Sequence, residues 1–346
     1  MKECLNYKKI SSEILECFNC SHFCRIKEGG TGICGARQNL GGKLYSLIFG
    51  QAAAVNIDPV EKKPLFHFFP GTFAYSFGTL GCNFRCANCQ NFDISQISGF
   101  KGRPEEYKNF TWGRPLSPEQ IIAKAKKNHC RSLAYTYNEP TIFLEYAFET
   151  MKLAKKSGIK NIWVSNGFMS KKTLEIILPY LDAVNIDIKS FEDKFYQSNC
   201  GARLAPVLEN CQRLVEKNVW LEITTLLIPT LADNEKMLKE LAKFIKEKLG
   251  EFVPWHLSAF SGVISWKLQH LPETPVKTIA KAYQIGQEAG LKYVYAGNVR
   301  EKNLESTFCP RCGQIVVERI GYQITRRDKD GSCASCGEKI EGIFDD

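Results

Sequence analysis

The stretch that decides the fold is residues 73–91, FAYSFGTLGCNFRCANCQN. A β-rich run ends at residue 80, and three cysteines in C-x3-C-x2-C spacing follow it: Cys82, Cys86 and Cys89. Three thiolates cannot close a four-ligand site, but they suit three irons of a [4Fe–4S] cluster and leave the fourth iron open. A structural zinc knuckle that lacks one ligand is the alternative. We therefore predict an open [4Fe–4S] site directly after a first strand.

The rest of the chain alternates β-rich runs with lysine-rich helical stretches. Six further strands are expected, at residues 132–137, 161–166, 183–188, 220–228, 253–260 and 292–297. Helices are expected from Ser117, where SPEQ forms a capping box, and at residues 140–157, 170–180, 204–217, 233–248 and 275–289. Such alternation predicts a parallel sheet, whereas a dinucleotide-binding fold would carry G-x-G-x-x-G after the first strand. The predicted fold is α/β, a full or partial TIM-like (β/α)6 barrel over residues 70–303, with its active site at the carboxyl ends of the strands.

An N-terminal Cys-rich region, residues 1–69, precedes the expected barrel. It carries four cysteines in C-x2-C-x3-C-x9-C spacing: Cys17, Cys20, Cys24 and Cys34. Four thiolates can close a zinc tetrahedron or hold a [4Fe–4S] cluster, and the spacing does not choose between the two. His22 lies inside the set and can also serve as a ligand. A second metal or Fe–S cluster is therefore expected here.

Residues 304–346 break the rhythm and carry another four-cysteine set, in C-x2-C-x20-C-x2-C spacing: Cys309, Cys312, Cys333 and Cys336. Two C-x2-C knuckles, each followed by glycine and joined by β-prone residues, are typical of a zinc ribbon. Iron is the competing metal, because a tetrahedral site of four sulfurs accepts both. A closed site leaves no position for chemistry, so we expect a zinc-ribbon-like module with a structural or docking role.

The overall composition agrees with a metal-binding protein of the cytoplasm. The three clusters take all but four of the 15 cysteines; the remaining ones, expected to have no role, are Cys4, Cys130, Cys200 and Cys211. Clustered cysteines in a chain without an apolar signal-peptide core indicate metal binding in a reducing compartment. The net charge of +9 comes from lysines spread along expected helix faces, as on ordinary solvated surfaces. We expect no membrane span, and the absence of a basic–aromatic motif argues against a nucleic-acid partner.

Polar residues stand where the next strands end, at the edge expected to carry the active site. They are Asn138 and Glu139 in YTYNEPT (135–141), Ser165 and Asn166 in VSNGF (164–168), Asp187 and Lys189 in NIDIKS (185–190), and His256 in WHLSAF (255–260). Taken alone, each has an ordinary explanation as a turn residue, a helix cap or an exposed lysine. Their position beside the three-cysteine loop makes them candidate ligand-binding residues.

The motif CNFRCANC on a first-strand loop resembles the cluster motif of radical S-adenosylmethionine (SAM) enzymes. The resemblance implies that SAM binds the open iron through its amino and carboxylate groups. An electron from the [4Fe–4S] cluster then cleaves SAM to methionine and a 5′-deoxyadenosyl radical, which abstracts a hydrogen atom. Asn88 departs from the superfamily, which usually has an aromatic residue before the third cysteine.

The resemblance also implies a role for each strand-end residue. The implied set is Asn138 and Glu139 toward the SAM amino group, Ser165 and Asn166 beside them, Lys189 toward the SAM carboxylate, Asp187 at a cation or substrate site, and His256 near the SAM ribose. With CxxCxxxC…GxxGxCxxR, GCNFxCxxCQNxxIS and YVYAGN, these motifs resemble the radical SAM enzyme of the AmmeMemoRadiSam system, which is related to pyruvate formate-lyase activating enzymes.

This narrower resemblance implies hydrogen abstraction from a protein or peptide substrate, in the manner of a glycyl-radical activase. The implied partners are a reductant such as flavodoxin or ferredoxin, an AMMECR-type protein and a Memo-type protein. Modification of a small molecule or of RNA is an alternative within the same chemistry. A non-catalytic scaffold that binds several metals is an alternative of another class, and it has no use for Asn138, Glu139 and Lys189.

Overall fold

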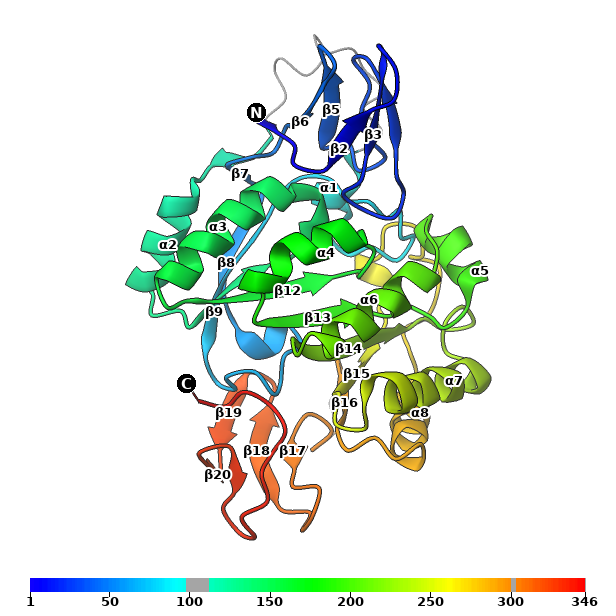
Figure 1. Ribbon diagram of the computed structural model, residues 1–346. Helices are drawn as coiled ribbons and strands as arrows, with labels where there is room; N and C mark the ends of the chain where they lie inside the picture. The colour runs from blue at the N-terminus through cyan, green and yellow to red at the C-terminus, as the bar shows by residue number, and fades with distance from the viewer. Residues whose placement is uncertain (98–111, 300–302, 346) are drawn as a thin grey trace.

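The computed structural model describes residues 1–97, 112–299 and 303–345 and is built around one eight-stranded sheet (Figure 1). In order across the sheet, its strands are β16 (Val294–Gly297), β15 (Trp255–Ala259), β14 (Trp220–Leu227), β13 (Ala183–Asp187), β12 (Lys160–Ser165), β11 (Ser132–Tyr135), β9 (Phe73–Gly78) and β8 (Ala54–Pro59). All neighbours are parallel except β8 and β9. Because β8 and β16 are edge strands, the sheet is a partial TIM-like barrel, and the predicted α/β class is confirmed.

Helices connect the parallel strands where the sequence predicts them, and they cover one face of the sheet (Figure 1). The longer ones are α2 (Pro118–Lys127), α3 (Leu144–Lys156), α4 (Lys171–Ile177), α6 (Ala205–Glu216), α7 (Glu235–Phe244) and α8 (Val276–Glu288). The shorter ones are α1 (Phe92–Ser95), α5 (Asp193–Phe195), 3-10 turns at Val60–Lys62, Pro140–Phe143, Leu178–Tyr180 and Gly262–Ile264, and π turns at Tyr196–Cys200 and Ile245–Leu249. The predicted capping box begins α2, since the Ser117 hydroxyl accepts from Gln120 N at 3.2 Å and the Gln120 side chain accepts from Ser117 N at 2.9 Å.

One strand of the sheet lies outside the predicted barrel range. Strand β8 runs antiparallel to β9, from the pair Ala54–Gly78 to the pair Pro59–Phe73, although the sequence places residues 54–59 in the N-terminal region. Its sequence, AVNIDP, mixes half-buried and exposed positions and lacks a continuous apolar run, so it carries a weak strand signal. The central sheet therefore begins at residue 54.

Residues 1–46, here called the N-terminal module, form two small antiparallel sheets at one end of the molecule (Figure 1). Their strands are β1 (Lys2–Glu3), β6 (Lys43–Ser46) and β5 (Arg37–Leu40) in one, and β2 (Tyr7–Lys9), β3 (Ile14–Cys17) and β4 (Arg25–Lys27) in the other; a separate pair joins β7 (Gln51–Ala52) to β10 (Arg114–Pro115). A buried ion pair ties the module to α3: Arg37 Nη2 lies 2.6 Å from Glu145 Oε2, and each side chain is 1% exposed. Removing either partner by mutation would leave an uncompensated buried charge at this contact.

Residues 304–345, here called the C-terminal module, lie at the opposite end of the sheet (Figure 1). They form strands β17 (Thr307–Phe308), β18 (Ile315–Ile320), β19 (Gln323–Arg326), β20 (Asp328–Lys329) and β21 (Ser332–Cys333). Val316, Val317 and Phe344 share one buried cluster with Phe66 and Tyr295 of the barrel. Since Phe66 lies in the segment that leads into β9, the module covers the amino ends of the strands and leaves their carboxyl ends free.

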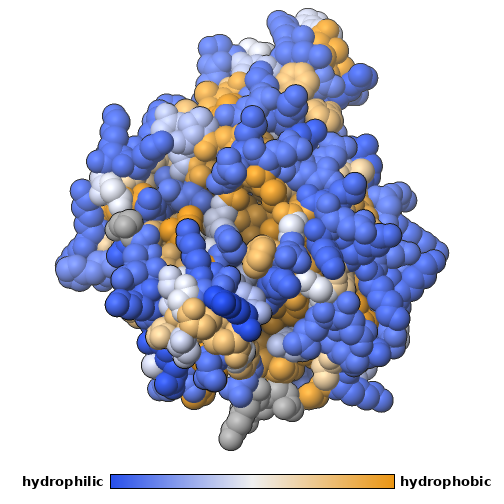
Figure 2. All heavy atoms as spheres, turned by 60° about the horizontal axis from the view of Figure 1, so that its bottom comes forward, coloured by the Kyte–Doolittle hydropathy of each residue, from blue (hydrophilic) through white to orange (hydrophobic). Residues whose placement is uncertain are grey.

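The outer surface is mostly hydrophilic. In the view of Figure 2, hydrophilic residues surround a broken band of hydrophobic ones. Lys124, Lys126 and Lys127 of α2 are exposed, as expected for a charge carried on solvated helix faces. In the described part of the chain, no helix combines the length and the apolar character needed to cross a bilayer.

A buried histidine makes the stability of this fold depend on pH. Burial lowers the pKa of His67 to about 4, while Nδ1 hydrogen bonds to Glu341 O at 2.6 Å and Nε2 to the Tyr295 hydroxyl at 2.6 Å. Between pH 6.5 and about 4 the unfolded chain binds a proton at this residue that the folded chain does not, so stability rises with pH in that window. We expect His67 to contribute about 3 kcal/mol to the loss on acidification.

Urea unfolding at several pH values between 4 and 7 measures this slope. The variant His67→Gln, which titrates nothing, is expected to be less stable at pH 7 and to show a flatter slope. His270→Gln, at an exposed histidine, is the matched control and keeps the wild-type slope. An unchanged slope in His67→Gln would contradict the assignment.

Candidate active site

The three-cysteine loop leaves the carboxyl end of β9, where the barrel architecture places an active site. Asn138 holds the start of the loop, because its side chain accepts from Thr79 N at 3.1 Å and donates to Gly81 O at 2.8 Å. Gly81 has φ +95°, and a side chain there would overlap the carbonyl oxygen of Cys34. Asn138, predicted to bind a ligand, therefore positions Cys82 through the backbone of the loop.

Glu139 is the centre of a buried hydrogen-bond network at this edge. Its carboxylate accepts from Thr141 N at 3.0 Å, from the Ser165 hydroxyl at 2.9 Å and from Asn166 N at 2.8 Å. Burial raises the pKa of Glu139, and these hydrogen bonds only partly oppose that rise. The structure thus brings three of the predicted residues together across β11 and β12.

Asn83 joins this network to the cysteine loop, and the sequence patterns gave no reason to select it. Asn166 Nδ2 donates to Asn83 Oδ1 at 2.8 Å. The Asn83 Nδ2 group is buried and has no hydrogen-bond partner among the described residues. A buried hydrogen-bond donor without a partner costs free energy of folding. The unpartnered amide therefore suggests that a ligand supplies the acceptor atom.

Lys189 and Asp187 form the second predicted pair, with Nζ 3.0 Å from the carboxylate. Burial alone would lower the pKa of Lys189, but the nearby acidic groups of Asp187, Cys86 and Cys200 raise it above its ordinary value. The Lys189 backbone N–H also donates to the Tyr196 hydroxyl at 3.0 Å. A permanent cation therefore lies beside Cys86, in a position to meet an anionic group.

Cys200 is a residue of the site that sequence spacing does not reveal. Its thiol hydrogen bonds to that of Cys86, which raises the pKa of Cys86 and lowers that of Cys200. Two backbone bonds hold the π turn Tyr196–Cys200 along the loop: Arg85 N donates to Cys200 O at 2.8 Å, and Ala87 N donates to Asn199 O at 3.0 Å. A turn more than a hundred residues away in the chain supplies this thiol, so only the fold could have identified it.

Among the described residues, His256 hydrogen bonds to Glu222 and to none of the other predicted site residues. His256 Nε2 lies 2.6 Å from Glu222 Oε2, and its ring packs edge-on against Phe66 at 4.6 Å. Glu222 also accepts from the backbone of Phe66 and His67, in the segment that leads into the amino end of β9. The expected position of His256 beside a SAM ribose stays a prediction; His256 is buried and paired with Glu222.

The four N-terminal cysteines, here called the knot, line one small cavity of about 10 Å³ together with Asn19, His22, Ile26, Gly32, Ile33, Arg37 and Ile142. The His22 ring points toward the neighbouring loop, where Nε2 lies 2.8 Å from Asn83 O. The predicted knot thus has its four thiols around a common space, directly beside the three-cysteine loop.

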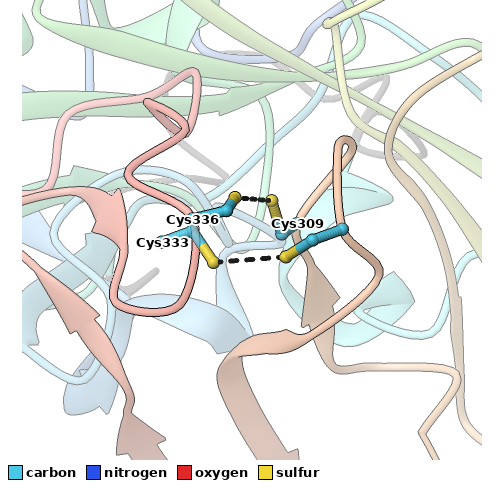
Figure 3. Close-up of side chains that lie close together, drawn as sticks. Cys309, Cys333 and Cys336 are labelled. Carbon is cyan, nitrogen blue, oxygen red and sulfur yellow. Dashed lines mark hydrogen bonds between the residues drawn. The ribbon is translucent and has the colours of Figure 1, made fainter.

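The C-terminal cysteines lie much closer together. Figure 3 shows sulfurs of the two knuckles facing one another, with Cys309 and Cys336 3.6 Å apart; Cys312 and Cys333 are also 3.6 Å apart. All four sulfurs lie within 4.8 Å of one another. A tetrahedral zinc with Zn–S bonds of about 2.3 Å sets its sulfurs about 3.8 Å apart. The geometry fits one tetrahedral ion.

Comparison with known proteins agrees with the cysteine loop and the polar residues found at the carboxyl edge of the sheet. The sequence profile described as "Radical SAM superfamily" matches residues 77–245, from the end of β9 through α7. The chain belongs to the radical SAM superfamily. Membership implies an enzyme with SAM and a [4Fe–4S] cluster as cofactors, and it excludes the alternative of a non-catalytic scaffold.

The chain is also similar to several individual proteins. "Uncharacterized protein MJ0808" of Methanocaldococcus jannaschii is 40% identical over 347 residues, which is 99% of this chain and 100% of that protein. The pyruvate formate-lyase-activating enzyme of Clostridium pasteurianum is 26% identical over 187 residues, 51% of this chain and 72% of that enzyme. A solved domain of a pyruvate-formate lyase-activating enzyme from Bacteroides vulgatus is 20% identical and covers 48% of this chain and 99% of that domain, with a TM-score of 0.43.

The residues of this radical SAM enzyme fit both cofactors. The loop thiols of Cys82, Cys86 and Cys89 lie at the carboxyl edge, and none of the described residues closes them into a compact single-ion site. This spacing suits a cluster, in which each thiolate binds a different iron. The unpartnered Asn83 amide and the Lys189 cation supply donors for oxygen atoms of an amino acid.

Proposed function

We propose that this radical SAM enzyme cleaves SAM reductively and abstracts hydrogen from a protein or peptide substrate, as a glycyl-radical activating enzyme does. The observation that carries the proposal is the gathering of the three-cysteine loop, the Glu139 network and the Lys189–Asp187 pair at one edge of the sheet. When bound, the cluster and SAM supply the electron and the 5′-deoxyadenosyl radical for this reaction.

The chain's own residues bind and orient the cofactors. Cys82, Cys86 and Cys89 would hold three irons, and Lys189 would bind the carboxylate of SAM by a charge-assisted hydrogen bond. Glu139 would act on the cofactors indirectly. Its carboxylate accepts a hydrogen bond from the backbone of Asn166, and the Asn166 side-chain amide in turn donates to Asn83. The buried Glu139 network also keeps water from this side of the site.

The substrate class rests on the relatives. Pyruvate formate-lyase-activating enzymes align with about half of this chain. This supports a protein substrate and a low-potential reductant such as flavodoxin or ferredoxin. The motif resemblance adds an AMMECR-type and a Memo-type protein as partners. A small molecule or RNA is the alternative substrate.

We further propose zinc at the C-terminal cysteines. Four sulfurs at near-tetrahedral spacing favour a single closed-shell ion without an open position. The site lies at the amino ends of the strands, so its role is to fold the C-terminal module and offer a docking surface. Metal analysis of the purified chain should find about one zinc per chain.

The test of the proposed reaction is anaerobic reconstitution with iron and sulfide, followed by reduction in the presence of SAM. We expect a broad absorbance near about 400 nm and formation of methionine and 5′-deoxyadenosine. Adding the AMMECR-type and Memo-type proteins should give a protein-bound radical visible by electron paramagnetic resonance. Absence of SAM cleavage by a fully loaded cluster would overturn the proposal.

Lys189→Met is expected to weaken SAM binding about 10- to 100-fold, because it removes one charge-assisted hydrogen bond. The cluster content should stay at the wild-type level, since Lys189 is not a ligand of iron. Equilibrium titration of the reconstituted enzyme with SAM measures the effect. Lys171→Met, at a lysine whose side chain is 70% exposed on α4, is the matched control and keeps the wild-type affinity. Equal affinities in the two variants would contradict the assignment.

A further inference from the structure

The two four-cysteine sets differ in how closely their sulfurs gather. In the C-terminal module all four lie within 4.8 Å of one another, as a single ion requires. Across residues 1–97, 112–299 and 303–345, this is the one group of three or more Cys, His, Asp or Glu side chains that gathers so closely. The knot thiols are therefore more widely spread, yet they face one common cavity. An iron–sulfur cluster suits such a ring of thiolates, because each binds a separate iron at the rim of the cluster.

The surroundings of the knot also suit an iron–sulfur cluster. Cys17 and Cys34 are 6% and 8% exposed, and the cavity wall includes Ile26 and Ile142, which are 2% and 1% exposed. Exclusion of water protects the sulfide ions and tunes the reduction potential. Arg37, whose guanidinium pairs with Glu145, also lines this cavity. No open position for a substrate is needed here, so the site suits electron storage rather than chemistry.

The backbone of the knot touches the backbone of the three-cysteine loop. Gly81 lies so close to the carbonyl oxygen of Cys34 that no side chain could be placed there. Cys82 is the next residue along the chain. A ligand of the knot and a ligand of the loop are thus separated by one non-bonded contact and a few covalent bonds.

Two side chains add further connections between the knot and the loop. Arg85 lies in the loop. Its guanidinium donates to the carbonyl oxygen of Ile33, the residue before the knot ligand Cys34, and to Cys82 O at 2.8 Å. His22 of the knot lies 2.8 Å from Asn83 O in the loop. The two cysteine sets are therefore parts of one packed unit, although nearly fifty residues separate Cys34 from Cys82 in the sequence.

We propose that the knot holds a second iron–sulfur cluster, and that this cluster passes single electrons to the cluster of the three-cysteine loop. A low-potential one-electron donor reduces the knot cluster, which is then reoxidised as it reduces the loop cluster, so each transfer moves one electron and no atoms. The second cluster stands independently of the reaction proposed above, whereas its relay role rests on that reaction.

Iron and sulfide analysis of the full-length chain tests for the second cluster. The variant Cys82→Ala/Cys86→Ala/Cys89→Ala removes the loop cluster and leaves every knot residue unchanged. After anaerobic reconstitution we expect it to retain iron and sulfide in equal amounts, about four of each for a cube or about two for a smaller cluster. Dithionite should then produce a paramagnetic signal. Zinc in place of iron, without sulfide, would overturn the proposal.

Two further variants assign this iron to the knot. In the same triple background, Cys24→Ser/Cys34→Ser is expected to lose the remaining iron and sulfide. Cys4→Ser is the matched control, because Cys4 is 5% exposed and packs against Cys17 without lining the cavity. We expect Cys4→Ser to keep the full iron content. None of these measurements requires SAM cleavage, so their failure is distinguishable from failure of the proposed reaction.

Rapid mixing with a one-electron donor tests the relay. In the chain with both clusters we expect a fast phase of loop-cluster reduction, followed by SAM cleavage. In Cys24→Ser/Cys34→Ser, with the loop cluster loaded to the same extent, the fast phase should be lost. An unchanged rate of loop-cluster reduction would overturn the relay role.

Discussion

Alanine in place of Cys82 is expected to abolish reductive cleavage of SAM. The loss of one of three thiolates leaves an iron without its protein ligand at the carboxyl edge of the sheet. The absorbance near about 400 nm should fall with the loss of the loop cluster. Production of 5′-deoxyadenosine under reducing conditions is the measurement, and it should drop to the level of a reaction without enzyme.

Cys86 calls for a more careful variant than Cys82. Its thiol hydrogen bonds to that of Cys200. When Cys86 is replaced, the Cys200 sulfur can therefore bind iron in its place. We therefore expect Cys86→Ala to keep some cluster, and Cys86→Ala/Cys200→Ala to keep none. Cys130→Ala is the matched control, since Cys130 is buried before β11 and lies outside the site. Full SAM cleavage by Cys82→Ala would show that the cluster lies elsewhere.

The largest effect on stability is expected from Glu222→Ala. The Glu222 carboxylate is fully buried and accepts hydrogen bonds from the backbone of Phe66 and His67 at 2.9 and 2.8 Å and from Trp220 Nε1 at 3.0 Å, and it pairs with His256 Nε2 at 2.6 Å. Removing it leaves these donors without a partner in the interior. The expected cost is about 3–5 kcal/mol of unfolding free energy.

Urea unfolding of the reconstituted chain measures this cost. Glu240→Ala, at an exposed position of α7, is the matched control and should change the unfolding free energy by less than about 0.5 kcal/mol. Because Glu222 lies below the active edge, Glu222→Ala should bind SAM normally at temperatures where it stays folded. Equal stability of the two variants would show that the network contributes little to folding.

Local patterns carried most of the information about the fold and the metal ligands. Alternating β-rich and helical runs predicted the seven parallel strands. Short cysteine spacings predicted three metal sites, and the structure gathers the four sulfurs of the C-terminal set within 4.8 Å of one another. Strand β8 escaped prediction because it packs on one side only, at the edge of the sheet. Its membership depends on pairing with β9, which local composition does not encode.

Features made by distant contacts could not be predicted. Cys200 reaches Cys86 through a π turn far along the chain, and no spacing rule connects the two. His256 lies on a predicted strand, but its direction depends on the burial of Glu222, which composition alone does not reveal. Asn138 and Asn166 were found as polar strand-end residues, yet their partners Gly81 and Asn83 became visible only in three dimensions.

The two modules at opposite ends of the sheet have a consequence for assembly with other proteins. The C-terminal module covers the amino ends of the strands, and the cysteine loop lies at the carboxyl ends (Figure 1). A protein held by the C-terminal module would not compete with a substrate or a reductant for the same surface. Tethering and turnover can therefore proceed simultaneously, and a permanent complex with a non-substrate protein is compatible with repeated catalytic cycles.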